Sequence, residues 1–248
     1  MKKIIYLILP LFFITCDTEN ANDCFQKTGS IITEEMTVSA FTKIRVNRGV
    51  ELILKEGLNQ EVIVETGENL INDVSVEVQN GRLVITDNNT CNFTRDYNVT
   101  KVYVTAPNIT EIISSTQFKI QSDGVLNYNS IRVISEDFTD TTVIAVGNVN
   151  LELNSQDITV IANNLTHFYF SGFTQNLNVQ FVGGDGVFDG SNLMADRVQV
   201  FHRGTNKIVV NPQLELNGEL RSTGNLIAEN HPPIVNVATL YTGQLIFN

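Results

Sequence analysis

The sequence contains no tryptophan, only three cysteines among 248 residues, and few charged side chains, which make up 17% of the chain. Without tryptophan, the largest aromatic face for stacking a sugar is missing. Basic residues number 16 against 27 acidic ones, and the formal net charge is −11. Because binding to a nucleic-acid backbone needs clustered cations, we expect no nucleic-acid partner. The hydrophobic fraction of 42% is enough for a sizeable core and argues against intrinsic disorder.

The first fifteen residues have the pattern of an export signal. Lys2 and Lys3 precede an apolar run over residues 4–14, and Cys16 follows almost at once. This run is too short for a membrane-spanning helix, which needs about 20 residues. We predict a lipoprotein signal peptide at 1–15, lipidation at Cys16 and a membrane-anchored protein of the bacterial cell envelope, either periplasmic or at the cell surface. An ordinary signal peptide cleaved at another position is the alternative.

Residues 16–40 are polar, show no clear period and are predicted to form a tether. Two cysteines remain after Cys16, and outside the cytoplasm an even pair favours a disulfide. We therefore predict a bridge between Cys24 and Cys91, with two buried thiols as the alternative. The two cysteines lack partners at ligand spacing, so no metal site is predicted.

From residue 41 onward, short segments alternate between apolar and polar side chains, and no stretch of ten residues has a helical period. Asn80-Gly81 separates two such segments and predicts a hairpin, because both turn positions need a positive φ. Beyond residue 110, pairs of short segments recur, including one that ends in a strand at Val143-Ile144.

Small residues recur at similar intervals between these pairs, and a period near 20 is typical of a β-solenoid. We therefore predict an all-β fold in which strands of successive coils pair in parallel. A sandwich or jelly roll, which also has many short strands, is the alternative. The predicted turn positions are Ser135, Ser155, Ser171, Gly204 and Gly224.

Several segments of the chain follow a shared family pattern. They are residues 41–44, 49–52, 64–70, 81–85, Cys91-Asn92-Phe93 with Arg95, residues 104–108 and Tyr241-Thr242-Gly243. In these segments the chain resembles the auto-transporter adhesins with a head GIN domain, which are secreted or lipid-anchored bacterial envelope proteins. The resemblance implies a right-handed, single-stranded parallel β-helix over residues 41–248 with an N-terminal hairpin region. It supplies no catalytic residues, and only Ser171-Gly172 keeps the family's repeated turn.

Catalytic and metal-binding motifs are missing from the sequence. It has no Gly-x-Ser-x-Gly, no His-Glu-x-x-His and no phosphate-binding loop, so no catalytic, cofactor-binding or metal-ligating residue is predicted. His167, His202 and His231 are scattered and are expected at the surface or within a coil. The glycine-rich segment 183–190 occurs once and has the wrong aspartate spacing for a calcium-binding β-roll. We expect a turn there.

The densest aromatic run is 167–170. Alternation places Phe168 and Phe170 in the core and turns His167 and Tyr169 outward as a candidate binding surface. We predict a non-catalytic adhesin or surface scaffold whose partner is a glycan or an envelope or matrix protein.

Two other functions stay open. A carbohydrate-active β-helix enzyme would use Asp185, Asp189 or Asp196, with Arg197 and Arg203 nearby. A self-assembling structural protein would form a homo-oligomer through the C-terminal strand at residues 244–248.

Overall fold

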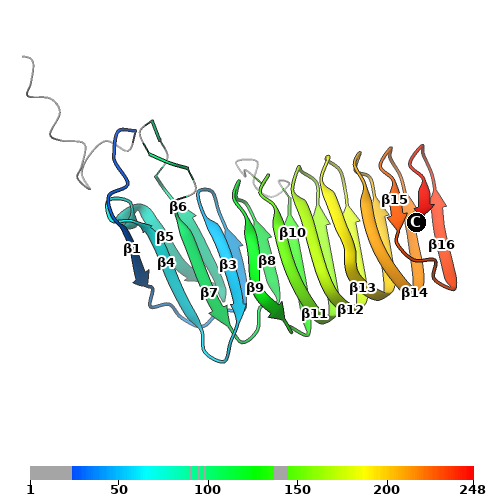
Figure 1. Cartoon of the computed structure of the whole chain (residues 1–248), viewed down its shortest axis with the longest axis horizontal. Coiled ribbons are helices and arrows are strands. Elements are labelled where there is room, and N and C mark those ends of the chain that lie inside the picture. The colour runs from blue at the N-terminus through cyan, green and yellow to red at the C-terminus, as the bar shows by residue number, and fades with distance from the viewer. Residues whose placement is uncertain (1–23, 90, 94, 98, 137–144) are drawn as a thin grey trace, which may run out of the picture.

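The computed structural model describes residues 24–89, 91–93, 95–97, 99–136 and 145–248. The predicted signal peptide, Cys16 and the strand expected at Val143-Ile144 lie outside these ranges. The described chain is all-β, as predicted, and its strands form one strongly curved sheet around an elongated core (Figure 1). No helix within the described ranges has the length and apolarity that crossing a membrane requires.

The described strands are β1 to β17, with one short 3-10 helix, η1, between β4 and β5. Their bounds are β1 Ile31–Glu35, β2 Lys43–Val46, β3 Glu51–Glu56, β4 Glu61–Gly67, η1 Ile71–Asp73, β5 Val74–Gln79, β6 Arg82–Asp87, β7 Lys101–Ala106, β8 Glu111–Ser114, β9 Ile120–Leu126, β10 Ser130–Ser135, β11 Val149–Ala162, β12 His167–Phe181, β13 Val187–His202, β14 Ile208–Leu220, β15 Leu226–Ala228, β16 Ile234–Thr239 and β17 Leu245–Phe247.

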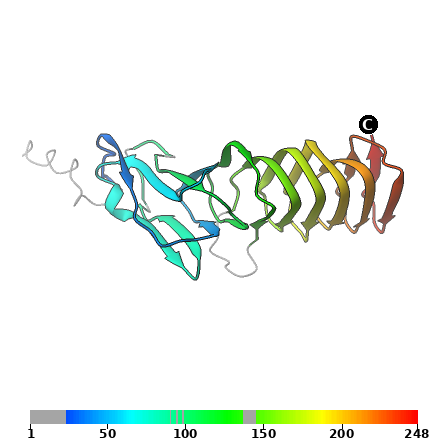
Figure 2. The ribbon, with the colours of Figure 1, turned by 90° about the horizontal axis from the view of Figure 1, so that it is seen from below.

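Strands β11 to β14 stack in parallel, one on the next (Figure 2). Val149 pairs with Phe168, Phe168 with Phe188, and Phe188 with Ile208, so each coil uses nearly the same length of chain. The inward side chains at these four positions are all buried. The period predicted from the sequence therefore corresponds to one coil of chain per layer.

Each long strand takes part in two ladders, which we call the front and back ladders. The front ladder joins β7, β3, β9, the first halves of β11 to β14, β15 and β17. The back ladder joins β6, β2, β8, β10, the second halves of β11 to β14, and β16. Apolar side chains from both ladders fill the space between them.

The expected turns at Ser155 and Ser171 are wrong, because both residues lie inside long strands, β11 and β12. The chain changes ladder there without losing its pairing, since Ser155 still aligns with Thr174 and Ser171 with Asn192. Ser135 is the last residue of β10. Gly204 and Gly224 lie between strands, as predicted.

The N-terminal end of the sheet is antiparallel. Strand β4 pairs with β7, β1 pairs with β4, and β5 pairs with β6. The β5–β6 hairpin turns at Asn80 (φ 53°) and Gly81 (φ 72°), and this confirms the Asn-Gly prediction. Because β1 falls within the segment expected to be a tether, part of that segment belongs to the folded body.

Strand order departs from chain order in this region. Strand β2 lies between β6 and β8, and β3 lies between β7 and β9. The coil made by β2 and β3 is thus covered on both sides by strands that come later in the chain. The coil of β6 and β7 covers one side, and the coil of β8 and β9 covers the other. No feature of the sequence period indicates this insertion.

Candidate functional site

The front ladder carries a row of side chains that runs from β7 to β13. Within β12, Phe168 and Phe170 are buried and Tyr169 is 40% exposed, as alternation predicts. Backbone register aligns Tyr169 with Asn150 of β11 and Asp189 of β13. The same alignment continues to the N-terminal end of the sheet. From β7 to β13 the row is Tyr103, Ile53, Gln121, Asn150, Tyr169 and Asp189.

A hollow of about 340 Å³ lies at Tyr169. Its volume is at the lower end of the range for small-molecule sites, which runs from about 300 to 1,000 Å³. Most of its lining side chains carry hydrogen-bonding groups, so it suits a polar ligand better than a lipid chain. The lining residues are Ser122, Asn150, Leu151, Glu152, Tyr169, Phe170, Ser171, Asp189, Ser191 and Asn192.

A second hollow, of about 470 Å³, lies at Tyr103. Both hollows are lined by Ser122, so they adjoin on the front ladder. Four strand-to-strand steps of about 4.8 Å separate Tyr103 from Tyr169, which places them about 19 Å apart. We call the two hollows together the front groove. The second hollow is lined by Glu51, Ile53, Lys101, Tyr103, Gln121, Ser122 and Asp123.

Irregular pairing shapes the front groove. The register shifts between Asn150 and Glu152 where β11 meets β9, and between Tyr169 and Ser171 where β12 meets β13. Extra residues at such bulges bend a strand and redirect its side chains, and bulges are common beside functional sites. The irregular pairing at β9 is held by a hydrogen bond from the Glu152 backbone N–H to Ser122 Oγ, 2.9 Å long.

Side chains in the groove are partly ordered by their own contacts. The Tyr169 hydroxyl lies 3.4 Å from His167 Nδ1, and the two rings meet edge to face. Ser191 donates to Asp189 Oδ1 through its hydroxyl, at 2.7 Å, and its backbone N–H, at 3.1 Å. At the other end, Lys101 forms an ion pair with Glu65, with Nζ and Oε1 3.4 Å apart. Ordered side chains lose less entropy when a ligand binds.

The aspartates considered for an enzyme do not share one hollow. Asp189 lines the hollow at Tyr169, whereas Asp185 and Asp196 do not. Asp185 lies in the turn before β13 and accepts a hydrogen bond from the Thr205 hydroxyl at 2.6 Å. Within the ranges that the structure describes, no cluster of three His, Cys, Asp or Glu side chains could hold a metal ion.

Sequence reasoning found one end of the front groove and missed the other. His167 and Tyr169 stand out because they alternate with buried phenylalanines. Tyr103 and Lys101 also alternate with buried residues, in β7, but the two tyrosines lie far apart in the sequence and nothing in the pattern connects them. Only the insertion of β3 between β7 and β9 brings Tyr103 into the same row.

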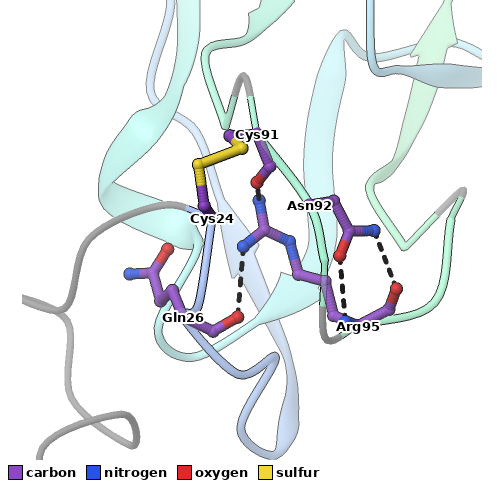
Figure 3. The surroundings of a disulfide bond; sticks show 5 residues. All are labelled: Cys24, Gln26, Cys91, Asn92 and Arg95. Carbon is purple, nitrogen blue, oxygen red and sulfur yellow. Dashed lines mark hydrogen bonds between the residues drawn. A yellow bond between two sulfur atoms is a disulfide. The ribbon is translucent and has the colours of Figure 1, made fainter.

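The predicted disulfide joins Cys24 to Cys91, with an S–S distance of 2.07 Å (Figure 3). Arg95 holds both of the bridged segments. Its guanidinium donates to the Cys91 carbonyl oxygen at 2.9 Å and to the Gln26 carbonyl oxygen at 3.2 Å. Asn92 fixes the Arg95 backbone with two hydrogen bonds (Figure 3). These contacts tie residues 24–26 to the loop after β6, so they stabilise the end of the molecule opposite the C-terminal strand.

Comparison with known proteins identifies relatives of this architecture. The sequence profile of a family described as "Putative auto-transporter adhesin, head GIN domain" matches residues 40–232. No curated protein shows significant similarity to the chain.

Solved structures share the fold at low sequence identity. A putative adhesin from Bacteroides fragilis NCTC 9343 superimposes with a TM-score of 0.78 at 16% identity, covering 90% of this chain and 99% of that one. A putative lipid binding protein from Parabacteroides distasonis ATCC 8503 gives a TM-score of 0.60 at 16% identity, with coverage of 90% and 98%. A putative adhesin from Parabacteroides merdae ATCC 43184 gives 0.60 at 14% identity, with coverage of 89% and 98%.

Proposed function

The chain belongs to the auto-transporter adhesin family with a head GIN domain, and from this membership we propose that it is a non-catalytic adhesin of the bacterial cell envelope. We propose further that its ligand is a glycan bound in the front groove. The observation that carries this proposal is the row from Tyr103 to Asp189, with a hollow at each tyrosine. An extended chain that lies along the molecule would contact both hollows at once.

The chemistry of the groove favours an uncharged sugar chain. Hydroxyl, amide and carboxylate groups line the groove, and these exchange hydrogen bonds with sugar hydroxyls. Tyr169 offers an exposed aromatic face beside them. Four carboxylates line the groove against one cation, Lys101, and the whole chain carries −11. The carboxylates are those of Glu51, Asp123, Glu152 and Asp189. Like charges would repel an acidic polysaccharide, so the proposed ligand is neutral.

Binding of the folded domain, residues 24–248, to an array of neutral and acidic glycans tests the proposal. We expect saturable binding to neutral chains and a loss of about tenfold or more for Tyr169→Ala, since losing an aromatic contact at the centre of an interface costs about 1.4 kcal/mol or more. Tyr97→Ala is the matched control, because Tyr97 is 78% exposed outside the groove. Equal binding by both variants would place the ligand elsewhere.

A carbohydrate-active enzyme is the second candidate, because Glu152 and Asp189 line the same hollow. Glycoside hydrolysis uses two carboxylates on either side of the scissile bond. Asp189→Asn separates the two functions. An adhesin keeps its glycan affinity within a few-fold, whereas an enzyme stops releasing shortened sugars. Release of product by the unmodified protein would favour the enzyme.

We also propose a right-handed β-helical winding and a lipid anchor at Cys16 after removal of residues 1–15. Parallel ladders in which each coil pairs with the next support the winding, because crossovers between parallel strands are almost always right-handed. The family supports a surface or envelope location. The apolar run directly before Cys16 supports the anchor.

A further inference from the structure

The coil at residues 230–248, which is the last coil that the structure describes, has an incompletely buried core. In the coil before it, the inward residues Leu216, Leu220 and Leu226 are completely buried. The equivalent inward residues Val235 and Leu245 are only partly buried. A further layer of chain would complete their burial, as each coil does for the one before it.

The backbone edge of this coil is also open. Within the described chain, β16 pairs only with β14, and β17 pairs only with β15. An unpaired strand edge is a template for another strand, and proteins usually protect it with charged side chains, bulges or a covering segment. Large apolar side chains surround this edge instead. They are Ile234 (50% exposed), Leu240 (55%), Tyr241 (64%), Ile246 (36%) and Phe247 (36%).

Charge distinguishes this coil from the rest of the molecule. Residues 230–248 contain no Asp, Glu, Lys or Arg, although the chain as a whole carries −11. The opposite end differs, since its edge strand β1 carries Glu34 and Glu35 and its edge strand β5 carries Glu77. Two copies of this acidic chain repel each other over most of their surfaces, and their C-terminal coils are where that repulsion is weakest.

From these observations we propose that the last coil docks against the last coil of a second copy, edge to edge through β16. The contact is isologous, because the same surface is used twice, and it closes at a dimer. The two β16 strands run antiparallel across a two-fold axis and supply each other's missing backbone partners. The uncharged, apolar surface favours a copy of itself over a charged partner.

The chain's own N-terminal segment does not reach this surface. Eight strand-to-strand steps, or about 38 Å, separate β6 from β16 along the back ladder. Cys24 is held by its disulfide to the loop after β6. In the proposed mature chain, residues 16–23 extend at most about 29 Å beyond Cys24. A second copy is therefore the occupant to which the proposal commits.

This dimer points the two N-terminal ends away from each other, because β1 and the last coil lie at opposite ends of the long axis (Figure 1). With the proposed anchor at Cys16, such a pair joins molecules on two opposed membranes. The bridging arrangement and the exclusion of the N-terminal segment both rest on the proposed processing at Cys16, whereas dimerisation of residues 24–248 does not.

Analytical ultracentrifugation of residues 24–248 across the micromolar range tests the dimer. We expect a monomer–dimer equilibrium, with a Kd raised about tenfold or more by Asn236→Glu and by Ala238→Lys, since like charges on the paired strands meet across the axis. The two substitutions have opposite charges, so a shared effect does not reflect net charge. Both positions lie on the outer side of β16, and circular dichroism checks that the variants fold.

Asn178→Glu is the matched control, because Asn178 occupies the same outward row as Asn236, three coils from the edge. It should dimerise like the unmodified protein. A strictly monomeric protein, a dimer unchanged by both edge variants, or a species that grows beyond the dimer would each overturn the proposal. The ultracentrifugation samples contain no sugar, so the measured dimerisation does not depend on whether the glycan proposal is correct.

Beads that carry the chain by its N-terminus test the geometry. They should aggregate without added glycan, and Ala238→Lys should keep them dispersed. If the protein dimerises in solution but the coated beads stay dispersed, the bridging arrangement is wrong and the dimer itself still stands.

Discussion

At the scale of single residues, burial fixes the charge of His202. Its side chain is 1% exposed, Nε2–H donates to the Asn206 carbonyl oxygen at 2.8 Å, and Nδ1 accepts from the Gly204 N–H at 3.2 Å. Loss of solvent lowers the pKa of His202, and the hydrogen bond to Asn206 opposes this only in part. Neutral imidazole therefore holds the turn between β13 and β14, a role that the scattered histidines of the sequence did not indicate.

The lowered pKa of His202 makes folding stability depend on pH. Below a pH of about 6.5 the unfolded chain binds a proton that the folded chain resists, so stability present above this pH is lost as the pH falls towards the folded-state pKa. Urea unfolding at pH 8 and pH 5.5 measures the loss. His202→Gln should cost about 1–3 kcal/mol at pH 8 and show a smaller further loss at pH 5.5. An equal loss on acidification in both proteins would assign the effect to other groups.

At the scale of elements, close approach of neighbouring strands depends on Gly172. Its φ is 109°, and a Cβ at this position would overlap the Leu153 carbonyl oxygen of β11. The residue lies where β12 begins to leave the front ladder, and a side chain there would push two coils apart. Gly172 of the Ser171-Gly172 pair is thus required by backbone geometry, although the pair lies inside a strand and not in the expected turn.

Gly172→Ala should destabilise the fold by about 2 kcal/mol or more, because both the positive φ and the contact with Leu153 are unfavourable for alanine. Thermal and urea unfolding measure the loss. Gly183→Ala is the control, since an added Cβ there meets no atom within 4 Å and the φ is ordinary. Similar losses for the two variants would show that the strand approach at Gly172 is adaptable.

Local patterns predicted part of this architecture. Asn80-Gly81 specified its hairpin, the alternation from His167 to Phe170 specified which side chains face the core, and the two cysteines that remain after Cys16 specified their bridge. The hairpin and the alternation depend on residues near in sequence, and the bridge depends on the number of cysteines. The front groove depends instead on which strands become neighbours. Tyr103 joins Tyr169 only because β3 is inserted between β7 and β9, and side-chain period carries no information about strand order.

At the scale of the whole molecule, the proposed anchor, groove and last coil occupy separate places. The described chain starts at Cys24 beside the antiparallel end, and the last coil lies at the other end of the long axis (Figure 1). The front groove lies between them on the side of the sheet. A rigid stack with a membrane attachment at one end would hold the other two surfaces away from the lipid.

The attachment is tested with the full chain expressed in a bacterial host. Cys16→Ser should move the protein from the membrane pellet to the soluble fraction, because the acyl chains that anchor it have no other attachment site. Cys24→Ser, which leaves the lipidation signal intact, should stay with the membrane. Retention of the Cys16→Ser protein in the pellet would contradict the lipid anchor.

The position of the β2–β3 coil has a consequence for the order in which the chain folds. This coil lies early in the chain, yet the strands that flank it come only with residues 82–106 and 111–126. Until then the coil lacks the strands that cover it on both sides, so its apolar residues stay exposed until later chain arrives. Beyond β10, each coil meets a completed surface as it emerges and can fold at once. Chaperones that meet the emerging chain should therefore engage its first half and release it before the second half is complete.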